Sequence, residues 1–473
     1  MNHKSILFFL GIFSFLVSIF SILNILYSIY FDVIIHLSSY FITFIISLLI
    51  GVIFCFIGFR HSKNITLIDQ IIFIILSFIL IPLLISIPYI LSVYNFGILD
   101  SYFEAVSGFT TTGFSIIRNI NIIDDPLILW RSSSQWLGGL LFILATIGTI
   151  GSKQIKIKPA YLISGGASGR NFYNNFNYNF IKITLIYLFS TILVIFLYKL
   201  VDVRLLDSFN LAFTTISSGG FIPADNLTNI IRNNLQVFIL SITLFFPIFN
   251  FFLLHDVLTK KISYKNHYED LHLLFLIIII TFFLYFFVVP NENFFNTFLG
   301  IVSSIATSGI TTSPSNFDLS LFLILLTVIG GSLISTSSGF KYTRFYMLFK
   351  ISYQEIYRLV KPMNITDKNL YAAGSKIDDQ DLKISFLVFI FFIGSIFILS
   401  SILTLDNLNF ENAFKLSMLT LTNTTASALY GLNNLVFYDL NNFTKISLIV
   451  FMILGKIEII AVIFLVKRFI FRE

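Results

Sequence analysis

The sequence predicts an all-α integral membrane protein. It consists of four related units around one central pore, each a span, a pore loop and a second span, and of two further N-terminal spans. Three observations predict this fold. Hydrophobic residues make up 56% of the 473-residue chain and charged residues only 11%, against about 45–50% and about 25% in soluble domains. Apolar segments long enough to cross a bilayer recur along the chain. A hydroxyl- and glycine-rich tetrad recurs four times between them.

The composition excludes two other classes of protein. So few charges could not cover the surface of a water-soluble fold of this length, so lipid must surround most of the chain. A disulfide-stapled secreted scaffold is excluded because Cys55 is the single cysteine.

Ten apolar runs of spanning length are predicted, at 6–31, 37–59, 67–93, 128–150, 180–200, 235–258, 271–289, 320–340, 384–404 and 444–466. If the N-terminus is cytoplasmic, 22 lysines and arginines lie on the inner side and five on the outer side, namely Arg118, Arg131, Arg204, Arg232 and Lys415. This bias predicts cytoplasmic N- and C-termini. The outer segments also carry 13 carboxylates, which reflect either ordinary topology bias or a field that concentrates cations at an outer mouth.

The repeat divides the chain into six parts: an N-terminal two-span extension (1–62), pore unit 1 (63–155), pore unit 2 (156–262), pore unit 3 (263–350), a cytoplasmic linker (351–382) and pore unit 4 (383–473). In each unit a half-apolar stretch of pore-helix length precedes the tetrad: Ser101–Phe109, Ser208–Ile216, Glu292–Ile305 and Asn409–Leu419. The tetrads are Thr110–Gly113, Ser217–Gly220, Ala306–Gly309 and Asn423–Ala426. A hydroxyl residue lies six positions before the end of each tetrad: Ser107, Thr214, Ser303 and Thr420.

Four such tetrads are typical of a cation filter. A ring of backbone carbonyls replaces the water shell of a monovalent cation without burying a net charge, and glycine adopts the required backbone conformation at least steric cost. The candidate ligands are Thr111, Thr112, Gly113, Ser218, Gly219, Gly220, Thr307, Ser308, Gly309, Thr424, Thr425 and Ala426. The alternative is four re-entrant turns that merely pack.

Two interior features are candidates for a gate. The run Gly330–Gly339 is rich in Gly and Ser, which favours an irregular intramembrane loop under the filter, with a small-residue helix seam as the alternative. Lys456 is a cation deep in an apolar span. It is either a positive charge below the filter that opposes cation leakage or the structural partner of a buried carboxylate. Glu458 lies about 200° further round that helix, so the two cannot both face the pore. The candidate gate residues are Ser335, Thr336, Ser337, Ser338, Gly339, Lys341 and Lys456.

The sequence offers nothing that indicates an enzyme. The six histidines have no ligand spacing, and no paired intramembrane carboxylates or nucleophile–base constellation can be recognised. No nucleotide-binding loop and no nucleic-acid-binding feature is present. The stretch Ile351–Lys383 carries Tyr353, Ile356, Tyr357 and Val360 at helical spacing, which predicts either an amphipathic helix on the membrane surface or a docking site for a cytosolic partner.

Several strings resemble the TrkH branch of the TrkH/KtrB/HKT superfamily of potassium transport proteins: Ser107–Phe114, Leu129–Gly139, Gly330–Lys341, Arg358–Pro362 and Gly455–Glu458. The extra N-terminal spans favour TrkH over KtrB. The chain departs from the family in three places. The fourth tetrad ends in Ala426, or Ser427 if the register slips, where the family has Gly-Pro. Lys456 replaces the usual arginine, and Gly-Phe replaces Gly-Gly before Lys341.

The resemblance implies potassium uptake across the bacterial inner membrane by the translocating subunit of a Trk-type system. It implies K⁺ as the transported ion without an organic cofactor, a homodimer within membrane lipid, and a cytosolic nucleotide-binding TrkA-type regulator. Two alternatives stay open, a Na⁺/K⁺-permissive transporter of the same superfamily and a membrane scaffold with a vestigial pore. The sequence also leaves channel-like flux and ion-coupled symport open.

Overall fold

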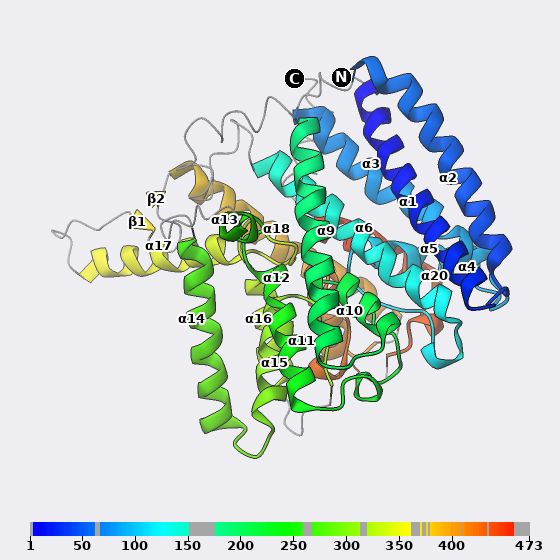
Figure 1. The fold of residues 1–473 in the computed structure, drawn as a ribbon. Helices are drawn as coiled ribbons and strands as arrows, with labels where there is room; N and C mark the ends of the chain where they lie inside the picture. The colour runs from blue at the N-terminus through cyan, green and yellow to red at the C-terminus, as the bar shows by residue number, and fades with distance from the viewer. Residues whose placement is uncertain are drawn as a thin grey trace.

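A computed structural model of the chain describes residues 3–61, 67–150, 176–258, 267–312, 319–360, 369–370, 375–376, 379–406, 408–432 and 435–457. Within these ranges the fold is helical (Figure 1), apart from the antiparallel pair β1 (Asn369–Leu370) and β2 (Ser375–Lys376) in the predicted linker. The predicted all-α membrane fold is therefore confirmed, with this small hairpin as an addition.

The N-terminal extension is a helical pair, α1 (His3–Tyr30) and α2 (Leu37–Gly58), followed by the short η1 (Phe59–His61). Glycines allow the two helices to approach closely. A Cβ atom added at Gly58 would lie 2.3 Å from the carbonyl oxygen of Lys4, and one at Gly11 would lie 2.8 Å from the sulfur of Cys55. Close backbone approach through small residues is how apolar helices associate in lipid.

The four units then follow in order. Unit 1 comprises α3 (Leu67–Ile85), α4 (Ile87–Ile90), α5 (Ile98–Phe109), η2 (Ile120–Ile122) and α6 (Asp125–Ile150). Unit 2 comprises α9 (Phe176–Leu200), α10 (Leu205–Ser217), η3 (Leu227–Asn229), α11 (Asn234–Thr243), α12 (Phe245–Ile248) and α13 (Phe252–Leu258). Unit 3 comprises α14 (Tyr268–Phe283), η5 (Leu284–Val288), α15 (Phe294–Ile305), α16 (Ser320–Ile329) and the start of α17 (Tyr342–Val360), which continues into the predicted linker 351–382. Unit 4 comprises α18 (Asp379–Thr404), α19 (Phe410–Leu421), η6 (Ala428–Tyr430), η7 (Phe437–Asp439) and α20 (Asn442–Ile457).

Seven helices of the described chain are long and apolar enough to cross a membrane: His3–Tyr30, Leu37–His61, Ile68–Ile90, Asp125–Ile147, Phe180–Leu200, Tyr268–Val288 and Leu382–Thr404. The other three predicted spans are the second spans of units 2, 3 and 4. Run 235–258 is three helices, interrupted next to Pro247, whose ring cannot continue a hydrogen-bonded helix. Run 320–340 stops being helical at Ile329, before Gly330 with its φ of 64°. Run 444–466 is described only as far as Ile457.

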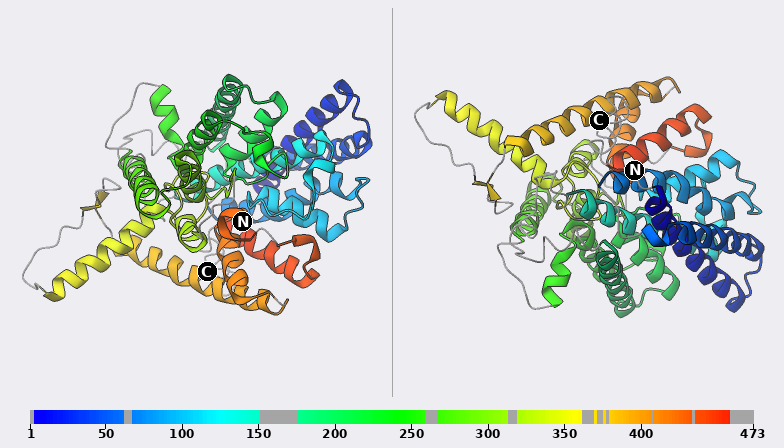
Figure 2. Two further views of the ribbon diagram at one scale, coloured as in Figure 1. Left: turned by 90° about the horizontal axis from the view of Figure 1, so that it is seen from below. Right: turned by 90° about the horizontal axis from the view of Figure 1, so that it is seen from above.

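The units surround a common centre, and the four pore helices α5, α10, α15 and α19 lead into it (Figure 2). The α1–α2 pair lies at the edge of the molecule, and α17 leads away from the main body. Each pore helix buries its last residues completely, so four chain segments from distant parts of the sequence meet in the interior.

Candidate functional site

The four pore helices end in the same backbone path. One residue just after each helix adopts the left-handed conformation: Thr111 (φ 57°), Ser218 (62°), Thr307 (57°) and Asn423 (48°). The N–H of the next residue donates back to a carbonyl five positions earlier. These bonds are Thr112 to Ser107 (2.9 Å), Gly219 to Thr214 (2.8 Å), Ser308 to Ser303 (3.0 Å) and Thr424 to Leu419 (2.9 Å). The repeat seen in the sequence is thus also a repeat of conformation.

This common path shifts the fourth tetrad by one residue. Asn423 takes the left-handed position that Thr111 holds in unit 1, so the equivalent tetrad is Thr422–Thr425 rather than Asn423–Ala426. Thr425, not Ala426, lies where the other units have glycine, and Leu419 is the residue six positions before it. The spacing of hydroxyl residues pairs Asn423 with Thr110, whereas the backbone conformation pairs it with Thr111, because sequence spacing does not show which residue adopts positive φ.

The ends of the four tetrads converge. A Cβ atom added at Gly113 would lie 3.1 Å from the Cα of Gly220, and one at Gly220 would lie 2.5 Å from the carbonyl oxygen of Ser308. A Cβ atom at Gly309 would lie 2.6 Å from the carbonyl oxygen of Thr425. The three glycines are therefore required by close approach of backbones.

Thr425 has a side chain at the position where the other three tetrads have glycine. Its Oγ1 would lie 2.0 Å from a Cβ atom at Gly113 and 1.5 Å from one at Gly220. The hydroxyl donates to the carbonyl oxygen of Thr112 at 2.9 Å. The ring of four corners is therefore not fourfold symmetric, and one of its carbonyls already has a hydroxyl partner.

The residues at the left-handed positions join the corners to one another through buried side chains. The hydroxyls of Ser218 and Thr307 lie 2.9 Å apart, which joins units 2 and 3. The Asn423 amide donates to Thr112 Oγ1 at 2.9 Å and to the carbonyl oxygen of Met452 at 2.8 Å, which joins units 4 and 1 to α20. These bonds link units 2 and 3, and units 4 and 1, directly beside the tetrads.

A buried ion pair lies beside the first two tetrads. Arg131 on α6 lies 2.9 Å from Glu104 on α5, and the two side chains are 2% and 0% exposed. Glu104 also accepts from the N–H of Ile116 at 2.9 Å, and the guanidinium of Arg131 lies 4.1 Å from the ring centroid of Phe221. Sequence reasoning counted both charges as outer-side residues and missed the pair. An arginine inside the apolar run 128–150 was the signal that could have found it.

Two glycines of the string Leu129–Gly139 allow α6 to pack against the pore helices. A Cβ atom at Gly138 would lie 1.7 Å from the carbonyl oxygen of Phe109, and one at Gly139 would lie 2.7 Å from the Cβ of Ser217. Larger residues at these positions would push α6 away from the ends of α5 and α10.

The candidate gate segment is an irregular loop in the interior. Residues 330–341 are not helical, and Gly330, Gly339 and Lys341 have φ values of 64°, 83° and 77°. The loop contacts two of the corners: the N–H of Ser338 donates to Thr307 Oγ1 at 2.9 Å, and the Thr336 hydroxyl donates to the carbonyl oxygen of Ile216 at 2.8 Å.

Two lysines lie at the same place. Lys341 Nζ donates to Ser335 Oγ at 3.1 Å and to the carbonyl oxygen of Ser337. Lys456 Nζ donates to Thr111 Oγ1 at 2.6 Å and to Ser338 Oγ at 2.9 Å, so Lys456 joins the first corner to the loop. Both ammonium groups face the ring of Phe142, at 5.3 and 4.2 Å from its centroid. No carboxylate in the described ranges forms an ion pair with Lys456, and Glu458 lies outside them.

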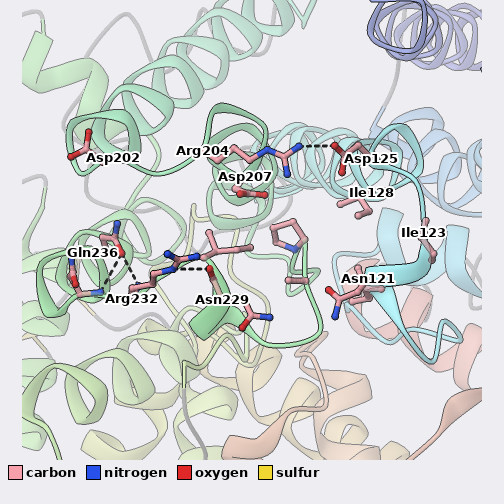
Figure 3. Close-up of a pocket in the computed structure, with 15 residues that line it drawn as sticks. Asn121, Ile123, Asp125, Ile128, Asp202, Arg204, Asp207, Asn229, Arg232 and Gln236 are labelled. Carbon is pink, nitrogen blue, oxygen red and sulfur yellow. Dashed lines mark hydrogen bonds and ion pairs between the residues drawn. The ribbon is translucent and has the colours of Figure 1, made fainter. Parts of the chain in front are cut away.

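A polar pocket of about 620 Å³ lies beside the segments that follow the first two tetrads (Figure 3). Arg204 and Asp125, which line it, form an ion pair at 2.7 Å. Burial raises the pKa of Asp207, which lines the same pocket, and the charge of Arg204 only partly offsets this rise. The pocket mixes acidic and basic groups. In the described chain, no group of three His, Cys, Asp or Glu side chains could hold a metal ion.

No family model matches the chain. Curated relatives do match over most of its length. An uncharacterized cation transporter of Methanocaldococcus jannaschii is 27% identical over 85% of this chain and 82% of its own length. The Trk system potassium uptake protein TrkG of Escherichia coli is 26% identical over 92% of each protein.

The fold matches a solved structure. The crystal structure of the potassium transporter TrkH from Vibrio parahaemolyticus has a TM-score of 0.83 to this chain at 22% identity, over 98% of each chain. The resemblance that the sequence motifs indicated is therefore confirmed, and the chain is similar to the TrkH family over nearly its full length, in sequence and in fold.

Proposed function

We propose that this chain carries K⁺ across the bacterial inner membrane as the translocating subunit of a Trk-type uptake system. The single observation that supports this most strongly is the convergence of four buried tetrads with the same backbone path. Relatives named as potassium uptake proteins, similar over most of the chain, support K⁺ as the ion and a system of more than one component.

The backbone oxygens of the corners would replace the water shell of the ion. In this proposal the ligands are the carbonyl and hydroxyl oxygens of Thr111, Thr112, Gly113, Ser218, Gly219, Gly220, Thr307, Ser308, Gly309, Thr424 and Thr425, while Ala426 lies one position beyond the ring. The pore helices end at these oxygens, and their partially negative C-terminal ends favour a cation over an anion.

The loop Ser335–Gly339 with Lys341 and Lys456 would form the gate. Two ammonium groups beside the filter repel a partly dehydrated cation, by about 4 kcal/mol for one charge at about 4 Å and an effective dielectric constant of about 20. Because Lys456 contacts both Thr111 and Ser338, a change in the loop would also move the barrier charge.

K⁺-dependent growth tests the proposed function. A bacterial host that lacks K⁺ uptake is transformed with this chain, with and without a TrkA-type partner. Growth at low external K⁺, together with ⁸⁶Rb⁺ uptake into proteoliposomes that contain the purified chain, is the expected result. Absence of both with a folded, membrane-inserted protein overturns the proposal and leaves the vestigial-pore scaffold.

A Na⁺/K⁺-permissive transporter is the second candidate, and one observation favours it. Thr425 places a hydroxyl against Gly113, Gly220 and the Thr112 carbonyl, so the ring departs from the arrangement of three glycine corners. Competition of Na⁺ with ⁸⁶Rb⁺ in the same proteoliposomes distinguishes the two candidates.

We further propose a homodimer in membrane lipid, a cytosolic nucleotide-binding regulator, and both termini in the cytoplasm. The exposed apolar side chains of α17, among them Tyr353, Ile356 and Val360, support a docking role for this helix. The proposal includes no organic cofactor, no nucleic acid and no enzymatic step, and it keeps the six-part division of the chain.

A further inference from the structure

Glu269 is a buried acid in the first turn of α14 that the proposed transport cycle does not use. Its side chain is only 9% exposed. Oε1 accepts from the N–H of Leu333 at 3.0 Å, and the same oxygen accepts from the hydroxyl of Thr343. Leu333 belongs to the intramembrane loop and Thr343 to the first turn of α17. One carboxylate oxygen therefore joins α14, the loop and α17.

The intramembrane loop is also held by the segment around the end of α12. The end of α12 and the break that follows it form three backbone bonds with the loop: Ser332 N–H to the carbonyl oxygen of Ile248 (2.8 Å), Ser337 N–H to that of Pro247 (3.0 Å) and Phe251 N–H to that of Ile334 (2.8 Å). Asp270, the residue after Glu269, accepts from the N–H of Asn250 at 2.8 Å in this same break. The start of α14 thus holds the loop directly and also holds the segment on which the loop rests.

The hydrogen bond from Thr343 links the side chain of Glu269 to α17, the helix that leads away from the main body of the protein. The far end of α17 exposes Tyr353 (69%) and Val360 (72%), and the helix points away from the four units (Figure 2). A displacement of α17 would separate Thr343 from Glu269. A buried acceptor that loses a donor is left under-satisfied, so the closed packing becomes less stable than an arrangement in which the loop has moved away and water reaches the acid.

We propose that Glu269 is a positioning residue that couples α17 to the intramembrane loop, so that movement of α17 releases the loop from beneath the filter. The inference rests on the proposed function in taking that loop as the gate. Asp270 and Lys341 are the charged groups that act on Glu269. Its coupling role uses the acceptor Oε1 and does not require its charge.

The test measures loop exposure in a way that does not depend on transport. The parent carries Cys55→Ser and Ser332→Cys. Ser332 is 0% exposed and its hydroxyl has no hydrogen-bond partner in the described chain, so this exchange removes no bond. A thiol reagent applied from the cytoplasmic side should label the cysteine of Ser332→Cys about tenfold faster in Thr343→Ala, the factor that one buried hydrogen-bonding group left unsatisfied gives in a two-state equilibrium. It should label at least tenfold faster in Glu269→Ala, which loses the bonds to both Leu333 and Thr343. Glu269→Gln keeps Oε1 and should label at the parent rate.

The double variant Glu269→Ala/Thr343→Ala should label no faster than Glu269→Ala, because within the described chain the Thr343 hydroxyl donates only to Glu269. Labelling of Thr343→Ala at the parent rate overturns the proposal, and this variant leaves the bond between Leu333 and Glu269 in place, so it should fold. If the parent transports ⁸⁶Rb⁺, basal ⁸⁶Rb⁺ flux should also rise in Glu269→Ala and in Thr343→Ala. Failure of transport in every protein, parent included, would contradict the proposed function alone, since the labelling result stands without it.

Discussion

At the scale of single residues, Thr425 distinguishes this chain from a ring of four glycines. Thr425→Gly should raise the K⁺ preference over Na⁺ by about fivefold, because it frees the Thr112 carbonyl from a hydrogen bond that contributes about 1 kcal/mol. The measurement is the K⁺/Na⁺ flux ratio in proteoliposomes. Ala426→Gly is the matched control and should leave the ratio unchanged. A shift in the control but not in Thr425→Gly would show that the fourth corner ends at Ala426 after all.

Lys456 is the second residue whose role one substitution can decide. Lys456→Gln removes the charge next to Thr111 and Ser338, so basal ⁸⁶Rb⁺ flux should rise by about tenfold or more, because a barrier of several kcal/mol is lost. Lys456→Arg should transport near the normal rate. The detergent melting temperature is measured in parallel. Normal flux with a lowered melting temperature would contradict the gate and leave Lys456 as a structural residue.

At the scale of elements, His267 joins α13 to the start of α14. Its two ring nitrogens lie 3.3 Å from Asp256 and 3.2 Å from Asp270. Burial alone would lower the pKa of His267, but the hydrogen bonds and charges of Asp270 and Asp256 outweigh burial and raise the pKa above its ordinary value. The cationic ring therefore stabilises this junction fully at pH values below the ordinary histidine range, and the stabilisation is lost as pH rises through the raised value.

The melting temperature of the unsubstituted chain in detergent should consequently fall over the pH interval above about 6.5, the ordinary pKa of histidine. His267→Gln should lower it at pH 6, with a loss of about 1–2 kcal/mol, and should flatten its pH dependence over that interval. His272, in the next turn of α14, provides the control substitution to Gln. A pH dependence that survives in His267→Gln would assign the effect to other groups.

At the scale of the whole molecule, the 22 basic residues predicted on the inner side, against five on the outer side, predict that both termini lie in the cytoplasm. In a Cys55→Ser background, Asn121→Cys and Tyr353→Cys place single thiols on exposed positions of the predicted outer loop and of α17. An impermeant maleimide added to intact cells should label only the first. Labelling of the second alone would reverse the topology and move the proposed gate to the outer side.

Much of the element-level description could be predicted from the sequence. Span lengths, the tetrads and the Gly/Ser-rich break can be predicted from local composition. In a bilayer, apolar segments must be helical, and non-helical backbone is tolerated only where protein or water surrounds it. The break at Gly330 illustrates this: the low helix propensity of a Gly/Ser-rich run predicts an interruption, and the structure has it, with a φ of 64° at Gly330. The interruption next to Pro247 was not predicted, since the apolar run continues through it.

The sequence by itself determined the class of fold, the fourfold repeat and the candidate filter tetrads of units 1 to 3, because these follow from hydropathy and from residue types at short spacing. Tertiary structure decided which residues meet. Lys456 and Thr111 are 345 residues apart, Thr425 and Thr112 are 313 apart, and Glu269 and Thr343 are 74 apart. The fourth corner, the buried pair Glu104–Arg131 and the Glu269 junction all depend on such contacts. Local pattern carries no information about them, since each arises only when close packing brings distant segments within hydrogen-bonding distance.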